Sequence, residues 1–203
     1  MKKIFLVRHG ESKWNVLKKI QGQQDVPLTD RGKIQAYQIG DRLLSEKIDS
    51  IYSSDLKRAY DTAAIIGKKL QIDVNPMTEL REISFGQWEG ASYDKIYSTN
   101  HKEIILWRKA PEKLNIDGIE SLKKLQLRAM SAVNKIINSE TGNNILIVSH
   151  SATLKTIILG LLNIDLANFK NLTLDNVSLT IVEFRNYNRV LKVLNDTSHI
   201  REI

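Results

Sequence analysis

The 203-residue chain contains no cysteine, which excludes disulfide bridges and metal sites built on thiolates. No segment approaches the roughly 18 consecutive apolar residues that a membrane span needs, so we expect none. The first residues, MKKIFLVRHG, have two lysines and a short apolar run, far too short for the hydrophobic part of a secretion signal. We therefore expect a cytoplasmic protein without disulfides.

The chain has an excess of positive charge, but its basic residues are not clustered in the sequence. The net charge is +7, and the lysines are spread along the chain rather than gathered in one block. Basic and aromatic residues do not alternate in the way that single-stranded nucleic-acid binders require, so we expect no nucleic-acid partner. A cationic protein can also bind small anions. Linkers, repeats and low-complexity tracts are absent as well, and residues 1–203 are expected to form one domain.

Apolar runs alternate with helical periodicity along most of the chain. This alternation predicts an α/β fold, a three-layer αβα sandwich with a mostly parallel central sheet. Asp55 and Asp117 are predicted N-caps of two helices, and residues 77–116 a small helical insertion over the active site. Strands are expected at 3–7, 48–54, 71–76, 143–150, 178–184 and 189–195, the last two forming an antiparallel edge hairpin, and helices at 28–46, 56–70, 92–100, 103–109, 118–136 and 151–162.

Polar residues follow three of the predicted strands. Arg8 and His9 leave the first strand, Arg58 follows the second, and His150 follows the strand that begins at 143. Ligands of open α/β sheets bind at the carboxyl ends of strands, so these side chains should converge. Two arginines and two histidines brought together would repel each other without an anion, and guanidinium groups match the oxygens of phosphate. The pattern indicates a phosphate site.

Six motifs in order resemble those of the histidine phosphatase superfamily, also called phosphoglycerate-mutase-like. They cover nearly the whole chain, whereas R-H-G alone would be weak. One departure is G-I-E-S, where the family more usually has G-G-E-S. The matching stretches are LVRHGESKWN, GQQDVPLTDRGKIQA, IYSSDLKRAYDTA, LREISFGQWEG, GIESLKKLQLR and ILIVSHSATLK.

The resemblance assigns catalytic roles to five residues. His9 would be the nucleophile that forms a phosphohistidine, and the nearby arginines should favour its neutral form. Arg8 and Arg58 would bind phosphate oxygens, and His150 would donate a hydrogen bond to them. Glu82 would protonate the leaving oxygen and then activate water. Glu82 occupies the family's L-x-E position, although Glu79 and Glu89 are local competitors.

Further residues are expected around the phosphate. Asn15 would bind it from the loop after His9, or serve simply as a helix N-cap. Gln21, Gly22 and Gln23 would lie on the rim and touch substrate, and Ser151 would bind phosphate beside His150. Neither a metal site nor a cofactor is expected, because no cluster of ligands has metal spacing and the mechanism needs neither.

Three functions are compatible with this pattern. We favour a metal-independent phosphatase of small phosphomonoesters, because mutases of this family are usually longer in the insertion and at the C-terminus. A cofactor-dependent phosphoglycerate mutase is the alternative. A module that only binds phosphorylated ligands is a lesser one, because every catalytic position is occupied. The expected partners are a small phosphorylated metabolite and the product phosphate. Dimers are common in the family, so a homodimer stays open.

Overall fold

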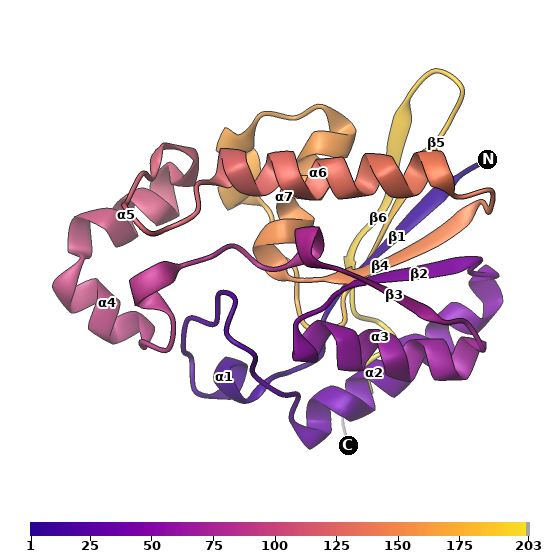
Figure 1. The fold of residues 1–203 in the computed structure, drawn as a ribbon, viewed down its shortest axis with the longest axis horizontal. Coiled ribbons are helices and arrows are strands. Elements are labelled where there is room, and N and C mark those ends of the chain that lie inside the picture. The colour runs from indigo at the N-terminus through magenta and orange to yellow at the C-terminus, as the bar shows by residue number, and fades with distance from the viewer. Residues whose placement is uncertain (202–203) are drawn as a thin grey trace.

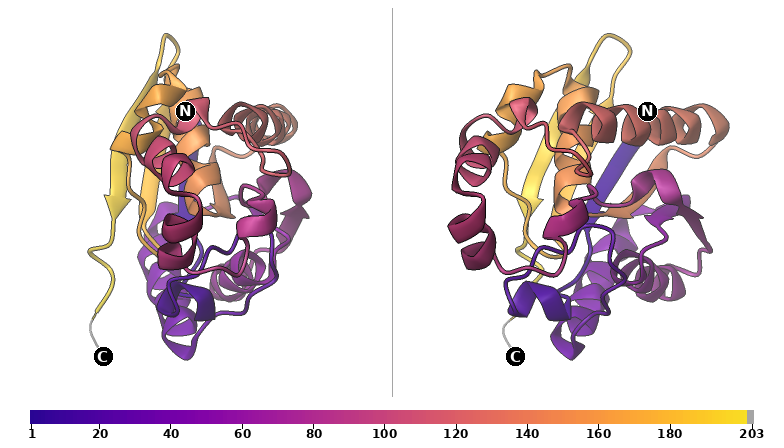
Figure 2. Two further views of the ribbon diagram at one scale, coloured as in Figure 1. Left: turned by 90° about the vertical axis from the view of Figure 1, so that its left-hand side faces the viewer. Right: turned by 60° about the vertical axis from the view of Figure 1, so that its left-hand side comes forward.

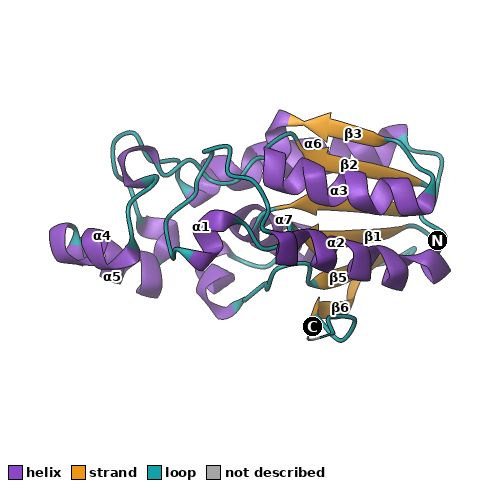
Figure 3. Ribbon diagram, turned by 90° about the horizontal axis from the view of Figure 1, so that it is seen from below, coloured by secondary structure: helices purple, strands orange, loops and turns teal. Residues whose placement is uncertain are grey.

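The computed structural model describes residues 1–201, and its centre is one six-stranded sheet in the order β3-β2-β4-β1-β5-β6. Four neighbouring strands, from β3 to β1, are parallel, and β5 and β6 are antiparallel at one edge. Figure 3 shows the strands in this order. Their bounds are β1 Lys3–Arg8, β2 Ser50–Ser54, β3 Val74–Met77, β4 Asn144–Ser149, β5 Leu179–Phe184 and β6 Arg189–Asp196.

Helices cover both faces of the sheet (Figure 1), so the predicted three-layer α/β fold is confirmed. Helices α2 and α3 pack on one face, and α6 and α7 pack on the other. Among residues 1–201, no helix has the length and apolarity to cross a membrane. The helices are α1 Lys13–Val16, α2 Asp30–Leu43, α3 Lys57–Leu70, α4 Tyr93–Thr99, α5 His101–Lys109, α6 Leu122–Ser139 and α7 Ser151–Leu162.

Strand β1 shows why the sheet needs two helical layers. Ile4 and Leu6 pack with the core that includes α6 and α7, whereas Phe5 and Val7 pack with the core beneath α2 and α3. All four side chains are essentially inaccessible to solvent. Successive side chains of a strand point to opposite faces, so an unbroken apolar run is stable only when both faces are covered. The chain leaves this buried run at Arg8, where the site begins.

Two predicted N-caps are wrong. Asp55 does not cap α3, because its carboxylate is held by the guanidinium group of Arg81. The Lys57 amide at the start of α3 instead donates to Asp25, from a distant loop. Helix α6 begins after Ser121, whose hydroxyl caps it, so Asp117 lies in the preceding turn. The start of α3 is thus set by contacts with distant segments, and the start of α6 by a hydroxyl that is better placed than Asp117.

The segment predicted as an insertion contains α4 and α5 and three short 3-10 helices, and it lies beyond the carboxyl ends of the parallel strands (Figures 1 and 2). Figure 2 views the molecule from this side. The segment has its own small core, in which Trp88 and Ile104 are buried with Ile20 from the loop after α1. It thereby supports one wall of the space above β1 and β4. The 3-10 helices are η2 Thr78–Leu80, η3 Gly86–Trp88 and η4 Pro111–Lys113.

Candidate active site

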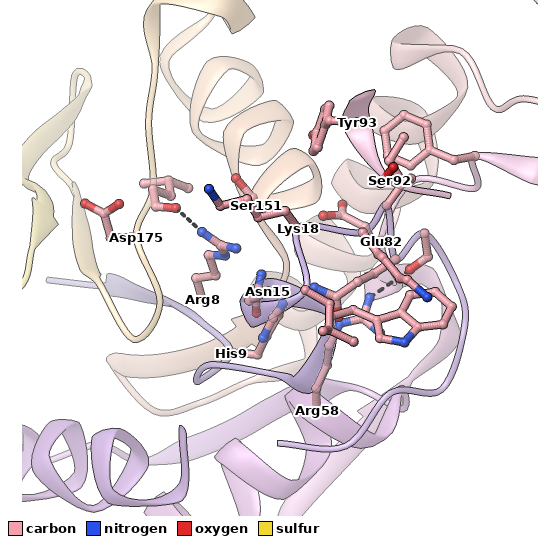
Figure 4. A pocket seen from close by; sticks show the side chains of 18 of the residues that line it. Arg8, His9, Asn15, Lys18, Arg58, Glu82, Ser92, Tyr93, Ser151 and Asp175 are labelled. Atoms are coloured by element: carbon pink, nitrogen blue, oxygen red, sulfur yellow. Dashed lines mark hydrogen bonds between the residues drawn. The ribbon is translucent and has the colours of Figure 1, made fainter. Parts of the chain in front are cut away.

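A cavity of about 610 Å³ lies at the carboxyl ends of the parallel strands. Arg8 and His9 enter it from the end of β1, Arg58 from the first turn of α3, and Ser151 from the start of α7. Figure 4 shows Tyr93 across the cavity from His9. The sequence predicts this convergence because parallel strands end at the same edge of the sheet.

His9 is held in a defined orientation and protonation state. Its backbone amide donates to the Ser149 carbonyl at 2.9 Å, which extends the β1–β4 pairing by one residue. Its ring Nδ1 lies 2.7 Å from the Gly10 carbonyl oxygen, an acceptor, so Nδ1 carries the proton and Nε2 has a free lone pair. Burial, together with the positive charges of Arg58 and Arg8, holds the pKa of His9 well below its ordinary value. The ring is therefore neutral, with an available lone pair on Nε2.

The two arginines are cations fixed by backbone carbonyls; Arg58 is buried and Arg8 is half-buried. Arg8 donates to the Leu174 carbonyl at 2.6 Å. Arg58 donates to the carbonyls of Gly22 and Gln24, both at 2.7 Å, and only 1% of it is exposed. Burial lowers the pKa of Arg8, and it lowers the pKa of Arg58 to about 10. Both guanidinium groups therefore remain charged at neutral pH.

His150 precedes α7, and its ring lies beside the ring of His9. The centroids of its ring and that of His9 are 5.2 Å apart. Its Nε2 lies 2.8 Å from the Ser54 hydroxyl oxygen, which already accepts the Leu56 amide proton. We assign the Ser54 hydroxyl as the donor to Nε2, which places the imidazole proton on Nδ1. Burial and the charge of Arg58 hold the pKa of His150 well below its ordinary value.

Several buried nitrogens of the site have no hydrogen-bond partner in the described part of the chain, which indicates whether an anion fits there. Arg8 Nε, Arg58 Nε and His150 Nδ1 are buried and have no hydrogen-bond partner among residues 1–201. Leaving a buried donor unsatisfied costs about 1–3 kcal/mol, and more for a charged group. A phosphate dianion would supply both acceptors and charge at this place.

Glu82 lies on the cavity wall, at the N-terminus of α7. Its carboxylate accepts the backbone amides of Ala152 at 3.3 Å and Thr153 at 3.2 Å, and the Ile83 amide at 3.0 Å. These donors fix the carboxylate in place. Of the two competing carboxylates, Glu89 is occupied by the amides of Gln23 and Phe85 and does not line the cavity.

Of the further residues expected around the phosphate, Asn15, Gln21, Gly22 and Ser151 line the cavity, whereas Gln23 does not. The amide oxygen of Asn15 accepts the Ser12 amide, so its nitrogen is the group that faces the cavity (Figure 4). The side-chain nitrogen of Gln23 instead donates to the Glu82 carbonyl at 3.0 Å. Gln23 thus supports the loop that bears Glu82.

The cavity is also lined by residues that the sequence pattern does not predict as part of the site. Trp14 lies inside the LVRHGESKWN motif, so that motif was a signal for it. Lys18 and Tyr93 carry no motif and could be found only from the fold. Within residues 1–201, no group of three or more His, Asp or Glu side chains is placed to hold a metal ion. The additional lining residues are Trp14, Leu17, Lys18, Lys19, Ile20, Phe85, Ser92, Tyr93, Asp94, Thr173, Leu174 and Asp175.

Comparisons with known proteins agree with this geometry. The chain is 32% identical over 202 residues to phosphoserine phosphatase 1 of Hydrogenobacter thermophilus, covering 100% of this chain and 96% of the relative. It is 34% identical over 212 residues to the probable phosphoglycerate mutase GpmB of Proteus mirabilis, covering 100% and 97%. A mycobacterial glucosyl-3-phosphoglycerate phosphatase in complex with VO3 has a similar structure, with a TM-score of 0.90, 27% identity and coverage of 97% and 100%.

The family model of the histidine phosphatase superfamily, branch 1, matches residues 4–197. This range includes β1, where His9 emerges, and extends to the end of the edge strand β6. The match therefore covers the sheet, both helical layers and every side chain of the site described above. The chain belongs to the histidine phosphatase superfamily, as the sequence motifs predict.

Proposed function

We propose that this chain hydrolyses small phosphomonoesters through a phosphohistidine formed on His9. The observation that carries the proposal is the neutral His9 ring, whose Nδ1 donates to the Gly10 carbonyl while its Nε2 is free in a site that also holds Arg8 and Arg58. Two of the similar proteins named above act, by their names, on phosphoserine and on glucosyl-3-phosphoglycerate. Both are small phosphomonoesters, in agreement with the predicted class.

The first step transfers the phosphoryl group to the enzyme. The Nε2 lone pair attacks phosphorus while the bond from phosphorus to the ester oxygen breaks. Arg8, Arg58 and His150 Nδ1 bind the non-bridging oxygens and stabilise the charge of the transition state. Asn15, from α1, and Ser151, from the start of α7, add hydrogen bonds. Protonated Glu82 gives its proton to the departing oxygen, and an alcohol leaves.

The second step regenerates the enzyme. Glu82, now a carboxylate, takes a proton from water while the water oxygen attacks phosphorus. The bond between phosphorus and Nε2 breaks, its electron pair returns to the ring, and inorganic phosphate leaves. Glu82 thus acts first as acid and then as base, and the cycle needs no other proton carrier.

A mutase remains the second candidate, because a relative of equal coverage is named a probable phosphoglycerate mutase. In a mutase the phosphoryl group passes to a substrate hydroxyl, and every attack by water destroys the primed enzyme. The cavity of about 610 Å³ leaves room for water beside a small substrate, which favours hydrolysis.

One assay separates the two candidates. The enzyme is given 3-phosphoglycerate with and without 2,3-bisphosphoglycerate, and phosphate and 2-phosphoglycerate are both measured. Phosphoserine, sugar phosphates and nucleotides are tested beside it. We expect phosphate release from members of the panel and little isomer. Isomerisation that is faster than phosphate release and depends on the bisphosphate would replace the phosphatase with the mutase.

The predicted cytoplasmic location and the homodimer stay predictions. Cell fractionation tests the first, and sedimentation of the purified chain tests the second. The predicted absence of a nucleic-acid partner is checked by retention on immobilised nucleic acid, which for a merely cationic surface should vanish steeply with added salt.

A further inference from the structure

We propose that Arg128 and Glu120 are positioning residues for Glu82: together they clamp the loop that carries the proton donor and so hold it at the leaving oxygen. This inference rests on the proposed phosphatase function. Neither side chain lines the cavity. Both come from the G-I-E-S motif and the helix that follows it, a stretch to which the proposed chemistry assigns no role.

The loop needs such support because it has no regular structure of its own. Residues 81–85 lie between the 3-10 helices η2 and η3, outside any helix or strand. Its backbone carbonyls therefore have no partners within a helix or a sheet, and buried carbonyls need donors from elsewhere. A proton donor on such a loop keeps its place only if other elements supply those bonds.

Arg128, on α6, supplies such hydrogen bonds. All five of its guanidinium N–H groups donate, three to backbone carbonyls and two to Glu120. Its Nη1 donates to the carbonyls of Glu79 and Arg81, both at 2.8 Å. Its Nη2 donates to the Glu82 carbonyl at 2.9 Å and to Glu120 at 2.8 Å. Its Nε donates to the other Glu120 oxygen at 2.7 Å. One planar fork thus binds the Glu79 carbonyl of η2, the loop carbonyls of Arg81 and Glu82, and one carboxylate, a set that a single lysine nitrogen cannot span.

Glu120 completes the clamp on the other side of Glu82. Its carboxylate accepts the Ser84 amide at 3.2 Å, and its own amide donates to the Ser84 carbonyl at 2.8 Å. The Glu120 and Arg128 side chains are only 14% and 23% exposed, so solvent screens the pair weakly. Residues on both sides of Glu82 are therefore fixed to the same ion pair.

The clamp also sets the loop relative to the donors that hold the Glu82 carboxylate. Two of those donors, the amides of Ala152 and Thr153, lie in the first turn of α7, whereas Arg128 is on α6. The two helices pack together, and Gln126 of α6 donates to the Thr156 carbonyl of α7 at 3.1 Å. The backbone of Glu82 is thus held by α6 and its carboxylate by α7, and these two helices pack against each other. A displacement of about 1 Å can cost on the order of 10²-fold in rate, so loosening the clamp should weaken proton donation.

A role through Glu82 differs measurably from a role in folding alone. An alkyl phosphate needs its departing oxygen protonated, whereas p-nitrophenyl phosphate hardly does. The informative quantity is kcat/KM, which covers the steps through release of the alcohol and not the later hydrolysis of the phosphoenzyme. The ratio of kcat/KM for an alkyl phosphate to that for p-nitrophenyl phosphate reports proton donation, independent of the fraction of enzyme that is folded.

The experiment measures this ratio in wild type, Arg128→Met, Arg128→Lys and Glu120→Gln, each checked by thermal melting. We expect Arg128→Met to lower the ratio by about tenfold or more. Arg128→Lys and Glu120→Gln are milder changes and should lower the ratio by smaller factors. These two variants serve as the test if Arg128→Met does not fold. Arg185→Met is the matched control, because Arg185 forms a comparable pair with Glu183 away from the site. It should leave the ratio unchanged.

A double variant shows whether the effect passes through Glu82. Glu82→Gln alone should lower the ratio strongly, and adding Arg128→Met to it should lower the ratio no further. An unchanged ratio in every folded Arg128 and Glu120 variant, with wild type active, would overturn the positioning role and leave the phosphatase in place. A full additional loss in the double variant would also overturn it. A wild type that hydrolyses neither ester would instead overturn the proposed function, and this role with it.

Discussion

The imidazole rings of His9 and His150 lie 5.2 Å apart, centroid to centroid, with their planes tilted by 59°. Two histidines this close, buried beside two arginines, cannot both carry a proton without strong repulsion, and the pKa of each is held well below its ordinary value. His9 donates its proton to the Gly10 carbonyl, whereas His150 keeps its proton on a nitrogen that has no partner among residues 1–201. One ring is therefore suited to attack phosphorus and the other to donate to its oxygens.

Replacing His9 by alanine should lower hydrolysis by about 10⁴-fold or more, because the covalent route is lost. Wild type that is mixed briefly with a radiolabelled substrate and quenched should carry an acid-labile, base-stable phosphoryl group. His101→Ala, at an exposed position on α5, serves as the control and should retain the label. No label on wild type, combined with substantial activity in His9→Ala, would rule out the nucleophile.

Inorganic phosphate should stabilise the folded protein, because it binds the native cluster of cations and not the unfolded chain. At a phosphate concentration of 100 Kd the gain is about 2.7 kcal/mol, a rise in melting temperature of roughly 5–10 °C. In Arg58→Met most of this rise in melting temperature should be lost. In Arg185→Met the full rise should remain. EDTA should change neither activity nor the melting temperature. Activity that disappears in EDTA and returns with a divalent cation would contradict a mechanism without metal.

Gly10→Ala should destabilise the protein by about 1–3 kcal/mol, because an added Cβ would lie 2.4 Å from the Gly32 carbonyl oxygen. The glycine thus allows the chain after His9 to pass against the start of α2. Gly40→Ala, inside α2, is the control. Its Cβ would lie 3.2 Å from Cδ of the flexible Lys69 side chain and at an ordinary contact distance of 3.8 Å from Ile66 Cα, so alanine should stabilise the helix by about 0.5–1 kcal/mol once the lysine shifts. Chemical denaturation measures both. Equal stability of wild type and Gly10→Ala would show that the backbone adjusts.

The parts of the site that the sequence predicts are those that follow a local rule. Strand β1 is an unbroken apolar run, so its burial and its carboxyl end could be located, and with them Arg8 and His9. The same rule places His150 at the end of β4. The family motif then selects Glu82 over Glu79 and Glu89, which local pattern alone does not.

The parts that it does not predict depend on pairs that are distant in the chain. Asp55 was expected to cap a helix, but it binds Arg81, 26 residues away. The Arg58 guanidinium is held by the Gly22 carbonyl, 36 residues earlier, and Arg128 holds the Glu82 carbonyl over 46 residues. Each of these side chains has an ordinary solvated alternative, and only the completed fold decides between them.

The stability of the protein should fall as pH is lowered below about 6.5. His9 and His150 have an ordinary pKa near 6.5 when unfolded and a pKa held well below it, chiefly by burial, when folded. Below pH 6.5 the unfolded chain therefore binds protons that the folded chain does not, and the free energy of unfolding decreases. Each such histidine contributes a slope of up to about 1.4 kcal/mol per pH unit, and above about pH 7.5 the slope vanishes.

Urea denaturation between pH 5 and 8, in buffers without phosphate, measures this slope. Phosphate must be left out because it binds the native state and its own charge changes in the same range. His9→Asn removes one of the two groups, so its slope between pH 5 and 6 should be smaller than that of wild type by about 1.4 kcal/mol per unit. His150→Asn should give a similar reduction. If both variants keep the wild-type slope, the two histidines are not the groups that are buried in their neutral form, and the lone pair assigned to His9 Nε2 would have to be withdrawn.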